Sequence, residues 1–193
     1  MFEFISGKVV ESGPAHVVLE NNGLGYFVNI SLTTYTCLKE LKETSLYIHE
    51  NIREDAYTLY GFHSIDEREL FRHLISVSGI GANTARMMLS SLPPDELKVS
   101  ILSGNANQLK GIKGIGLKTA QRVIVDLKDK LGKESIDEKL FTDSDNTVRE
   151  EALSALVMLG FAKAASQKAV DKILSSQPDC RVEQIIKQAL KML

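Results

Sequence analysis

Two glycine pairs are the residues whose spacing points most directly to chemistry: Gly79-Ile80-Gly81 and Gly114-Ile115-Gly116. Glycine allows a tight turn with a positive φ and leaves no Cβ over the main chain. Each pair is followed by an apolar pattern of helical spacing, so the first N–H groups and the dipole of a helix are expected to point at the turn. This arrangement favours binding of a phosphate by the backbone.

The glycine pairs belong to an internal repeat with an offset of 35 residues, in which residues 77–85 align with residues 112–120. Ile80 and Ile115 are expected to point inward and anchor the two hairpins. Contacts of this kind recognise the phosphate backbone rather than the bases, so binding should be largely independent of sequence. The predicted DNA-binding residues are Gly79, Gly81, Asn83, Thr84, Lys113, Gly114, Gly116, Lys118, Thr119 and Arg122.

The charge distribution supports this location, although the net charge of −2 does not by itself suggest DNA binding. Residues 1–62 carry four Lys or Arg and eight Asp or Glu, and residues 134–193 carry eight and ten. Residues 63–133 carry eleven and seven, and they form the only net-basic segment. A basic middle between acidic ends places the electrostatic footprint on the repeat.

The glycine pairs have two alternative interpretations. A single Gly-x-Gly can be a plain turn between helices, but two copies with matched flanks in the basic segment argue against that. A dinucleotide-binding loop needs a preceding strand and a third glycine, and no third glycine follows Gly81 or Gly116 at that spacing.

The first third of the chain predicts short strands separated by Gly and Asn turns. Five such strands indicate a small barrel or sandwich, and a barrel of the oligonucleotide-binding (OB) type fits the count. The expected strands are residues 2–10, 16–20, 26–30, 46–52 and 56–62.

The pattern changes to helical from Ser64, which begins a capping sequence. Helical spacing continues to about Gly132, so we expect an all-α domain over residues 63–132. Residues 133–146 are polar and charged and predict a flexible linker, with an ordered surface loop as the alternative. Residues 147–193 carry three short amphipathic stretches and predict a small three-helix bundle.

Several classes of function lack the residues they need. No apolar run approaches the ~20 residues that span a bilayer, and the first residues do not resemble a signal peptide. Cys37 and Cys180 lie far apart and are expected to be reduced thiols in a cytoplasmic protein. The four histidines show no metal-ligand spacing and no Walker loop occurs, so no metal, cofactor or ATP hydrolysis is expected.

The repeat resembles the tandem helix–hairpin–helix of the RuvA family, the Holliday-junction-recognition subunits of the bacterial branch-migration machine. The resemblance covers nearly the whole chain except the linker. The motifs that carry it are Gly23-Leu24-Gly25-Tyr26, Arg53-Glu54-Asp55-Ala56, Leu59-Tyr60-Gly61-Phe62, Gly116-Leu117-Lys118-Thr119-Ala120, Ile124-Val125-Asp126-Leu127-Lys128-Asp129 and Leu156-Val157-Met158-Leu159-Gly160-Phe161.

The resemblance implies a multidomain α+β protein: an OB-type barrel over residues 1–62, the tandem hairpins over residues 63–132, and a UBA-like three-helix bundle over residues 147–193. It implies a non-catalytic DNA-binding subunit, in the cytoplasm, that holds a four-way junction open in recombination, DNA repair and the SOS response. It further implies a homotetramer or double tetramer, with the hexameric ATPase RuvB docked on the bundle and the resolvase RuvC as a further partner.

The resemblance also assigns roles to residues outside the repeat. Glu54 and Asp55 match an acidic pin at the junction centre, where carboxylates repel phosphates by roughly 1 kcal/mol for unit charges ~4 Å apart in water. Without the family, this pair suits a solvated turn or, less well, a metal site that lacks a third ligand. Leu156, Leu159 and Phe161 match the surface that docks the ATPase. Leu156 lies on the core face of its own helix, whereas Leu159 and Phe161 flank the Gly160 turn and are expected to be exposed.

Two positions depart from the family pattern. Asn83 in the first hairpin and Leu117 in the second stand where a basic residue is expected. The backbone contacts should survive both changes, so Lys118 is the stronger candidate for a side-chain contact than Asn83. Arg86 and Arg122 are weaker candidates, because a charge on a helix is usually on a solvated face.

Alternative functions remain open at this point. The chain could be a helix–hairpin–helix accessory protein of another DNA repair enzyme, or a nuclease that uses the hairpins for grip. A nuclease would need clustered carboxylates or a nucleophile with its base, and neither pattern is present. A third alternative is a protein-interaction module whose hairpins only pack.

Overall fold

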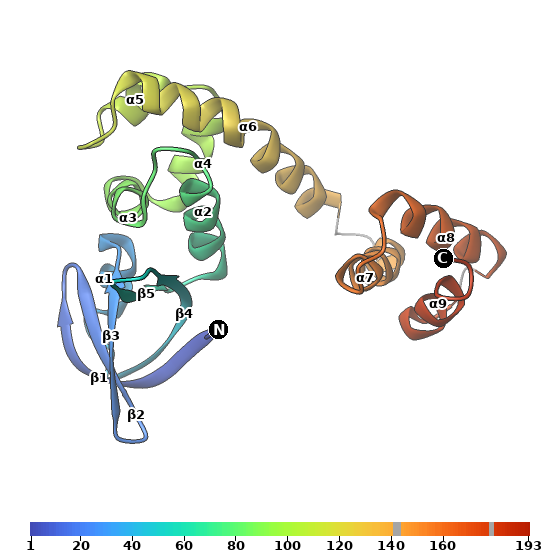
Figure 1. Ribbon diagram of the computed structural model, residues 1–193, viewed down its shortest axis with the longest axis horizontal. Coiled ribbons are helices and arrows are strands. Elements are labelled where there is room, and N and C mark those ends of the chain that lie inside the picture. The colour runs from blue at the N-terminus through green and yellow to red at the C-terminus, as the bar shows by residue number, and fades with distance from the viewer. Residues whose placement is uncertain (141–143, 178–179) are drawn as a thin grey trace. The chain divides into compact units, whose positions relative to one another are not determined.

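The computed structural model describes residues 1–140, 144–177 and 180–193, with the side chains of residues 133–147 excepted. The chain divides into two compact units, Met1–Gly132 and Lys133–Leu193, here called the N-terminal and C-terminal units. Each is described by itself (Figure 1). No helix in the described residues has the length and apolar character needed to cross a membrane.

The N-terminal unit begins with a closed five-stranded barrel, which confirms the predicted fold class. Neighbouring strands follow the order β1-β2-β3-β5-β4, and β3 and β5 are the parallel pair. Alternate side chains such as Val17 and Leu19 are fully buried inside it, as expected for strands with one core-facing side. The strands are β1 (Phe4–Gly13), β2 (His16–Asn21), β3 (Leu24–Ile30), β4 (Glu43–Ile52) and β5 (Tyr57–Phe62).

A short helix, α1 (Leu32–Leu38), lies between β3 and β4, where the sequence predicted no element. Its three threonines are weak helix formers, so periodicity alone did not reveal it. The Ser31 hydroxyl starts the helix by accepting the N–H of Thr34 at 2.9 Å.

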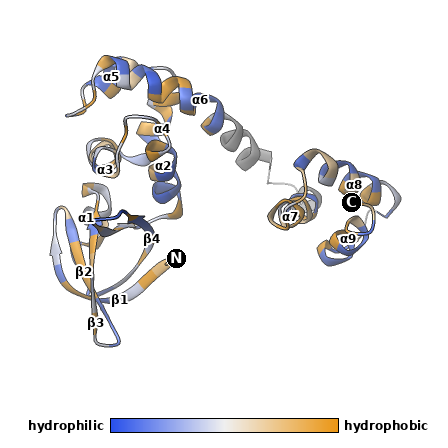
Figure 2. Cartoon of the chain, in the orientation of Figure 1, coloured by the Kyte–Doolittle hydropathy of each residue, from blue (hydrophilic) through white to orange (hydrophobic). Residues whose placement is uncertain are grey.

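Five helices complete the N-terminal unit, and the predicted capping of the first by Ser64 is confirmed, with the Ser64 hydroxyl 3.1 Å from the Glu67 nitrogen. Figure 2 shows hydrophilic and hydrophobic residues along α5 and the first part of α6, as amphipathic helices require. The helices are α2 (Ile65–Ile75), α3 (Ala82–Ser91), α4 (Pro94–Leu102), α5 (Ala106–Lys110) and α6 (Leu117–Leu140).

Helix α6 extends past Gly132, where the sequence predicted its end. The residues that follow are rich in Lys and Glu, which favour helix as well as solvation, so the composition did not separate the two. The predicted linker, residues 133–146, includes residues 141–143, which lie outside the described residues. Its flexibility stays a prediction.

The barrel and the helices meet along α2, and the meeting surface has an apolar part. Phe71 of α2 packs against Phe62 and Tyr60 of β5, with ring centroids 4.8 and 5.2 Å apart. Both β5 aromatics belong to the helical core rather than to the barrel core. The last barrel strand, β5, therefore forms the apolar surface against which the helical domain packs.

The meeting surface also has a buried polar part at the first turn of α2. Glu67 is only 2% exposed, and its carboxylate accepts hydrogen bonds from the hydroxyls of Ser31 and Thr34 in α1. Burial raises the pKa of this carboxyl above its usual value, while the Ser31 and Thr34 hydrogen bonds act in the opposite direction. The neighbouring Arg68 is also buried and pairs with the Glu3 carboxylate at 2.6 Å.

The C-terminal unit is a three-helix bundle, which again confirms the predicted fold class. Its helices are α7 (Ser144–Met158), α8 (Lys163–Ser176) and α9 (Val182–Ala189). An ion pair between Arg149 Nε and Asp171 Oδ1, 2.7 Å apart, joins α7 to α8 at the surface. The fully or nearly buried core residues are Ala152, Leu156, Ala169, Val170, Ile173, Ile185 and Ala189.

Candidate nucleic-acid interface

The two glycine hairpins have the same backbone geometry, as the repeat predicted. The first glycine of each takes a left-handed conformation, with φ of 91° at Gly79 and 90° at Gly114. In each hairpin the central isoleucine donates its N–H to the carbonyl three residues earlier at 3.0 Å, Ile80 to Val77 and Ile115 to Ile112. Glycine is needed at Gly79 and Gly114 because other L-residues are strained at such φ values.

The second glycine of each hairpin is not required by the protein itself. Gly81 has an ordinary extended backbone, with φ −88° and ψ 167°, and Gly116 has no positive φ. A Cβ added at either position would meet no described atom within 4 Å. The open space over these two residues leaves the main chain accessible to a ligand.

The hairpins are anchored from below as predicted. Ile80 and Ile115 are each 5% exposed and belong to the core of the helical domain. Their glycine neighbours are exposed, so each hairpin presents its backbone outward while its apolar side chain holds it in place.

The first turns of α3 and α6 carry the electrostatic part of the site. No described side chain caps α3, so its first N–H groups face outward without an internal acceptor. Thr84 and Thr119 are partly buried in these first turns, whereas Lys113 and Lys118 are exposed. Together these groups can hold an anion with main-chain donors, a hydroxyl and a positive charge.

Arg122 has a structural contact as well as a possible role toward DNA. Its Nη1 donates to the Ser78 carbonyl oxygen at 3.0 Å, across 44 residues of sequence. The helix after the second hairpin thereby touches the backbone of the first hairpin. This contact helps to hold the two glycine turns next to each other.

The structure accounts for the missing basic residue in the first hairpin. Asn83 Oδ1 lies 3.3 Å from the Tyr60 hydroxyl of the barrel, and the Arg86 guanidinium donates to the Ala15 carbonyl oxygen at 2.9 Å. A lysine at position 83 could not accept that hydrogen bond. The matching residue in the second copy, Lys118, is exposed. No described contact explains Leu117 in place of a basic residue.

The acidic pair lies in the tight turn between β4 and β5. Glu54 and Asp55 are both exposed, and the Arg53 N–H closes the turn by donating to the Ala56 carbonyl at 2.8 Å. The turn borders a hollow of about 220 Å³ that Asp55 shares with Gly81 and Asn83. The fold therefore brings the acidic turn and the first hairpin, 26 residues apart, to one surface. No group of three or more metal-ligating side chains occurs in the described part of the chain.

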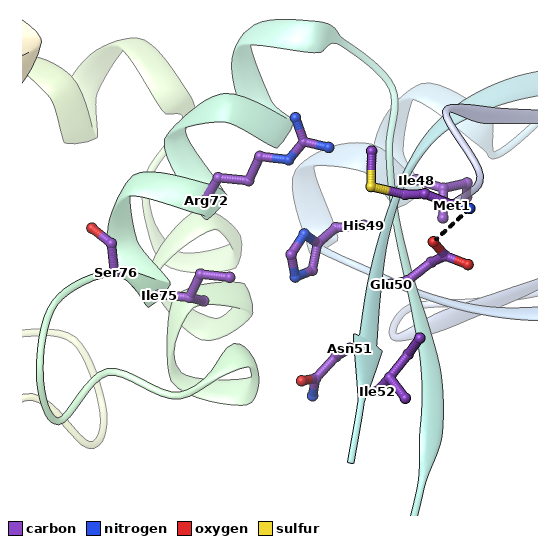
Figure 3. A pocket seen from close by; sticks show the side chains of 9 residues that line it. All are labelled: Met1, Ile48, His49, Glu50, Asn51, Ile52, Arg72, Ile75 and Ser76. Atoms are coloured by element: carbon purple, nitrogen blue, oxygen red, sulfur yellow. Dashed lines mark ion pairs between the residues drawn. The ribbon is translucent and has the colours of Figure 1, made fainter. Parts of the chain in front are cut away.

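A second, larger hollow of about 920 Å³ lies between β4 and α2 and was not indicated by the sequence. Figure 3 shows His49 and Asn51 on the strand and Arg72, Ile75 and Ser76 on the helix lining it. Burial, with Arg72 and Arg68 adding to it, lowers the pKa of His49. None of the predicted site residues lines this hollow.

The predicted partner-binding residues of the C-terminal unit differ in how far they are buried. Leu156 is completely buried in the bundle core, so its role as a surface contact is replaced by a packing role. Phe161 was expected to be exposed but packs partly against the core, because Gly160 turns the chain back with φ 97°. Leu159 is 60% exposed as expected, and Met158, which the sequence reasoning missed, is 87% exposed.

Three family models match the chain and together cover most of it. The model described as "RuvA N terminal domain" matches residues 1–61, and "SAM-like Helix-hairpin-helix tandem" matches residues 71–129. The model "RuvA, C-terminal domain" matches residues 147–193. The gap between the last two contains the predicted linker.

Curated relatives match along their whole length. The proteins named "Holliday junction branch migration complex subunit RuvA" from Bacteroides fragilis and Bacteroides thetaiotaomicron are 56% and 54% identical to the chain over 201 aligned positions. The protein of the same name from Christiangramia forsetii is 50% identical over 193 positions. Each alignment covers 100% of this chain and 100% of the relative.

Replacing Gly81 and Gly116 with alanine should weaken DNA binding without disturbing the fold. The added methyl groups meet nothing in the protein, so stability should change by less than about 1 kcal/mol. Loss of close main-chain contact with a phosphate should weaken duplex binding about tenfold per hairpin, measured by fluorescence anisotropy.

Two controls separate this effect from general damage. Gly25→Ala places a methyl group in ordinary contact within the barrel and should leave binding unchanged. Gly114→Ala should instead destabilise the unit by about 1–2 kcal/mol, because alanine is strained at a positive φ. Full affinity in the Gly81→Ala, Gly116→Ala protein would show that the hairpins do not bind through their main chain.

Proposed function

Because this chain belongs to the RuvA family, we propose that it is the DNA-binding subunit of a Holliday junction branch migration complex. The observation that carries the proposal is the pair of matched hairpins, each with an exposed main chain at the start of a helix, which suits two phosphates. Their contacts do not depend on bases, so the protein can stay bound while the junction moves along the DNA.

The other functions considered are less well supported. Family membership over the full length, including the barrel and the bundle, does not favour an accessory protein of another repair enzyme that shares only the hairpins. In the proposed complex this subunit is non-catalytic, and ATP hydrolysis belongs to the hexameric partner RuvB.

In this proposal the acidic turn works beside the hairpins. Glu54 and Asp55 would repel phosphates, and the hollow that Asp55 shares with Gly81 supports an action of this repulsion next to the first hairpin. Attraction at the hairpins and repulsion at the turn would hold an arm while keeping the strands at the crossover apart. A homotetramer, or a pair of tetramers, would repeat this arrangement on each arm of the junction.

The C-terminal unit would dock the ATPase through an exposed apolar patch. We define this patch as Val157, Met158 and Leu159, the run of exposed apolar residues at the end of α7. Large exposed apolar side chains next to one another mark interaction surfaces. We further propose that the resolvase RuvC is another partner of the protein, and that the protein acts in the cytoplasm and in the SOS response.

The direct test compares a four-way junction with linear duplex of equal length in a binding titration over a salt series. We expect tighter binding to the four-way form at every salt concentration, with affinity for both falling as salt rises, because phosphate contacts release counterions. Equal affinity for the two forms would reject a junction-specific function, and no binding to either would favour a protein-interaction module.

Neutralising the acidic turn with Glu54→Gln and Asp55→Asn should preserve junction binding but change the rate of ATP-driven branch migration. The reason is that the phosphate-binding hairpins are untouched, whereas the repulsion at the crossover is removed. The rate is measured with the partner ATPase on a fluorescent junction. A control that removes two exposed carboxylates elsewhere on the barrel, Glu40→Gln with Glu43→Gln, should migrate normally. Lost junction binding in the Glu54, Asp55 variant would contradict this role.

Charging the apolar patch with Met158→Asp and Leu159→Asp should abolish docking of the ATPase while leaving DNA binding intact. Each of these side chains contributes about 1.5–3 kcal/mol when fully buried, so the double change should weaken docking at least about a hundredfold. Calorimetry with the purified partner measures this. Gln167→Asp with Ser175→Asp adds the same charge on exposed positions of α8 and should have no effect. Unchanged affinity in the patch variant would remove the patch from the interface.

A further inference from the structure

The first turn of α2 is attached to the barrel by directional contacts that converge on one buried carboxylate. The Thr34 hydroxyl donates to Glu67 Oε2 at 2.7 Å, and the Ser31 hydroxyl donates to Glu67 Oε1. Thr34 Oγ1 also accepts the N–H of His63 at 3.2 Å, which ties the chain two residues before α2 to the same point. We call Ser31, Thr34 and Glu67 the carboxylate cluster.

Stability alone does not explain a carboxylate at this position. Taking a charge out of water is costly, and replacing a whole buried ionic cluster by apolar residues of similar volume is often neutral or stabilising. The aromatic packing of Phe71 on Phe62 already attaches α2 to the barrel. The carboxylate adds a constraint on the orientation of α2, because a hydrogen bond requires a defined geometry whereas the hydrophobic effect is not directional.

The other end of α2 is not packed closely against the barrel. The 920 Å³ hollow separates the last turn of α2 from β4, and Arg72, Ile75 and Ser76 face His49 and Asn51 across it (Figure 3). The helix is therefore held at its first turn and open at its last. With this geometry, the orientation of α2 on the barrel depends strongly on the contacts at the first turn.

The orientation of α2 helps to decide where the first hairpin lies, together with the direct hydrogen bonds of Asn83 and Arg86 to the barrel. Helix α2 ends at Ile75 and runs into the Gly79 turn, while the acidic turn is carried by the barrel strands β4 and β5. Helix α1 also contacts α3 directly, through the Thr33 hydroxyl and the Leu89 carbonyl oxygen at 2.7 Å. The cluster thus lies at the joint through which the acidic turn and the hairpin are positioned relative to each other.

We propose that the carboxylate cluster of Ser31, Thr34 and Glu67 positions the acidic turn and the first hairpin relative to each other. The resulting orientation selects a four-way junction over linear duplex. Linear duplex contacts only the hairpins, so the affinity for duplex does not depend on this orientation. A junction contacts the hairpin and the acidic turn together, so the affinity for a junction depends on how the two are oriented. The inference rests on the proposed function, since it names the residues that set its selectivity.

The decisive variant is Glu67→Met in the full chain. Methionine fills a similar volume without a charge but leaves the buried Ser31 and Thr34 hydroxyls without their acceptor. The protein should therefore stay folded with a melting temperature lower by roughly 5 °C, measured by thermal unfolding. The Ser31 hydroxyl still caps α1 through Thr34. Binding to linear duplex should be unchanged, whereas the preference for a four-way junction should fall at least about tenfold, because both hydrogen bonds to the Glu67 carboxylate are lost.

Three further variants separate positioning from general effects. Glu67→Gln keeps one acceptor oxygen and should recover most of the selectivity. Thr34→Val removes one hydroxyl without changing the side-chain shape and should lose selectivity as Glu67→Met does, which keeps a test available if Glu67→Met does not fold. Ser100→Ala removes a buried hydroxyl that donates to Gln108 within the helical domain at 2.8 Å, and it should leave selectivity unchanged.

The orientation itself is measured by pulsed electron spin resonance between labels on Lys8→Cys in the barrel and Lys110→Cys in α5, both exposed positions, with Cys37→Ser and Cys180→Ser. The wild-type distance distribution should be narrow, and it should broaden in Glu67→Met and Thr34→Val but not in Ser100→Ala. Unchanged width with unchanged selectivity in folded Glu67→Met or Thr34→Val overturns the inference. If the wild type itself shows no preference for the four-way form, the proposed function fails, and the distance distributions still report on the cluster.

Discussion

The constraint on which this molecule depends is that a backbone N–H can hold a phosphate only where no side chain covers it and no internal acceptor occupies it. Gly79 and Gly114 supply the left-handed turn, and Gly81 and Gly116 leave the main chain open above the start of a helix. The buried isoleucines hold each turn in place from the core side. The rest of the N-terminal unit can be understood as a scaffold that presents these turns.

The two hairpins share a backbone but have diverged in their side chains, and packing explains the difference. The first copy lies against the barrel, where Asn83 and Arg86 make hydrogen bonds to barrel residues. Among the described residues, no hydrogen bond joins the second copy to the barrel at the equivalent position, and Lys118 is exposed. In the proposed function, the first copy therefore combines phosphate binding with attachment to the barrel, and the second copy adds the positive charge of Lys118.

The joint between barrel and helices combines two kinds of force with different consequences. Apolar packing of Phe71 against the end of β5 supplies adhesion, while the buried Glu67 carboxylate supplies direction. A protein that only had to stay folded would not need the second, since burying a carboxylate raises its pKa and costs free energy. Orientation is valuable where two surfaces, the acidic turn and a hairpin, act on one ligand.

The sequence by itself determined the parts of this protein that follow from local pattern: the repeat, the glycine turns, the strands of the barrel and the three helices of the bundle. These depend on residues close together in the chain, whose periodicity and turn preferences are visible in one dimension. Only the tertiary structure decided that Asn83 lies next to Tyr60. It also decided that Phe161 packs partly on the bundle core while Met158 is exposed. The helix α1 and its hydrogen bonds to Glu67 were likewise not visible in the sequence. Each of these features depends on contacts between distant segments or on burial, and the spacing of neighbouring residues encodes neither the contacts nor the burial.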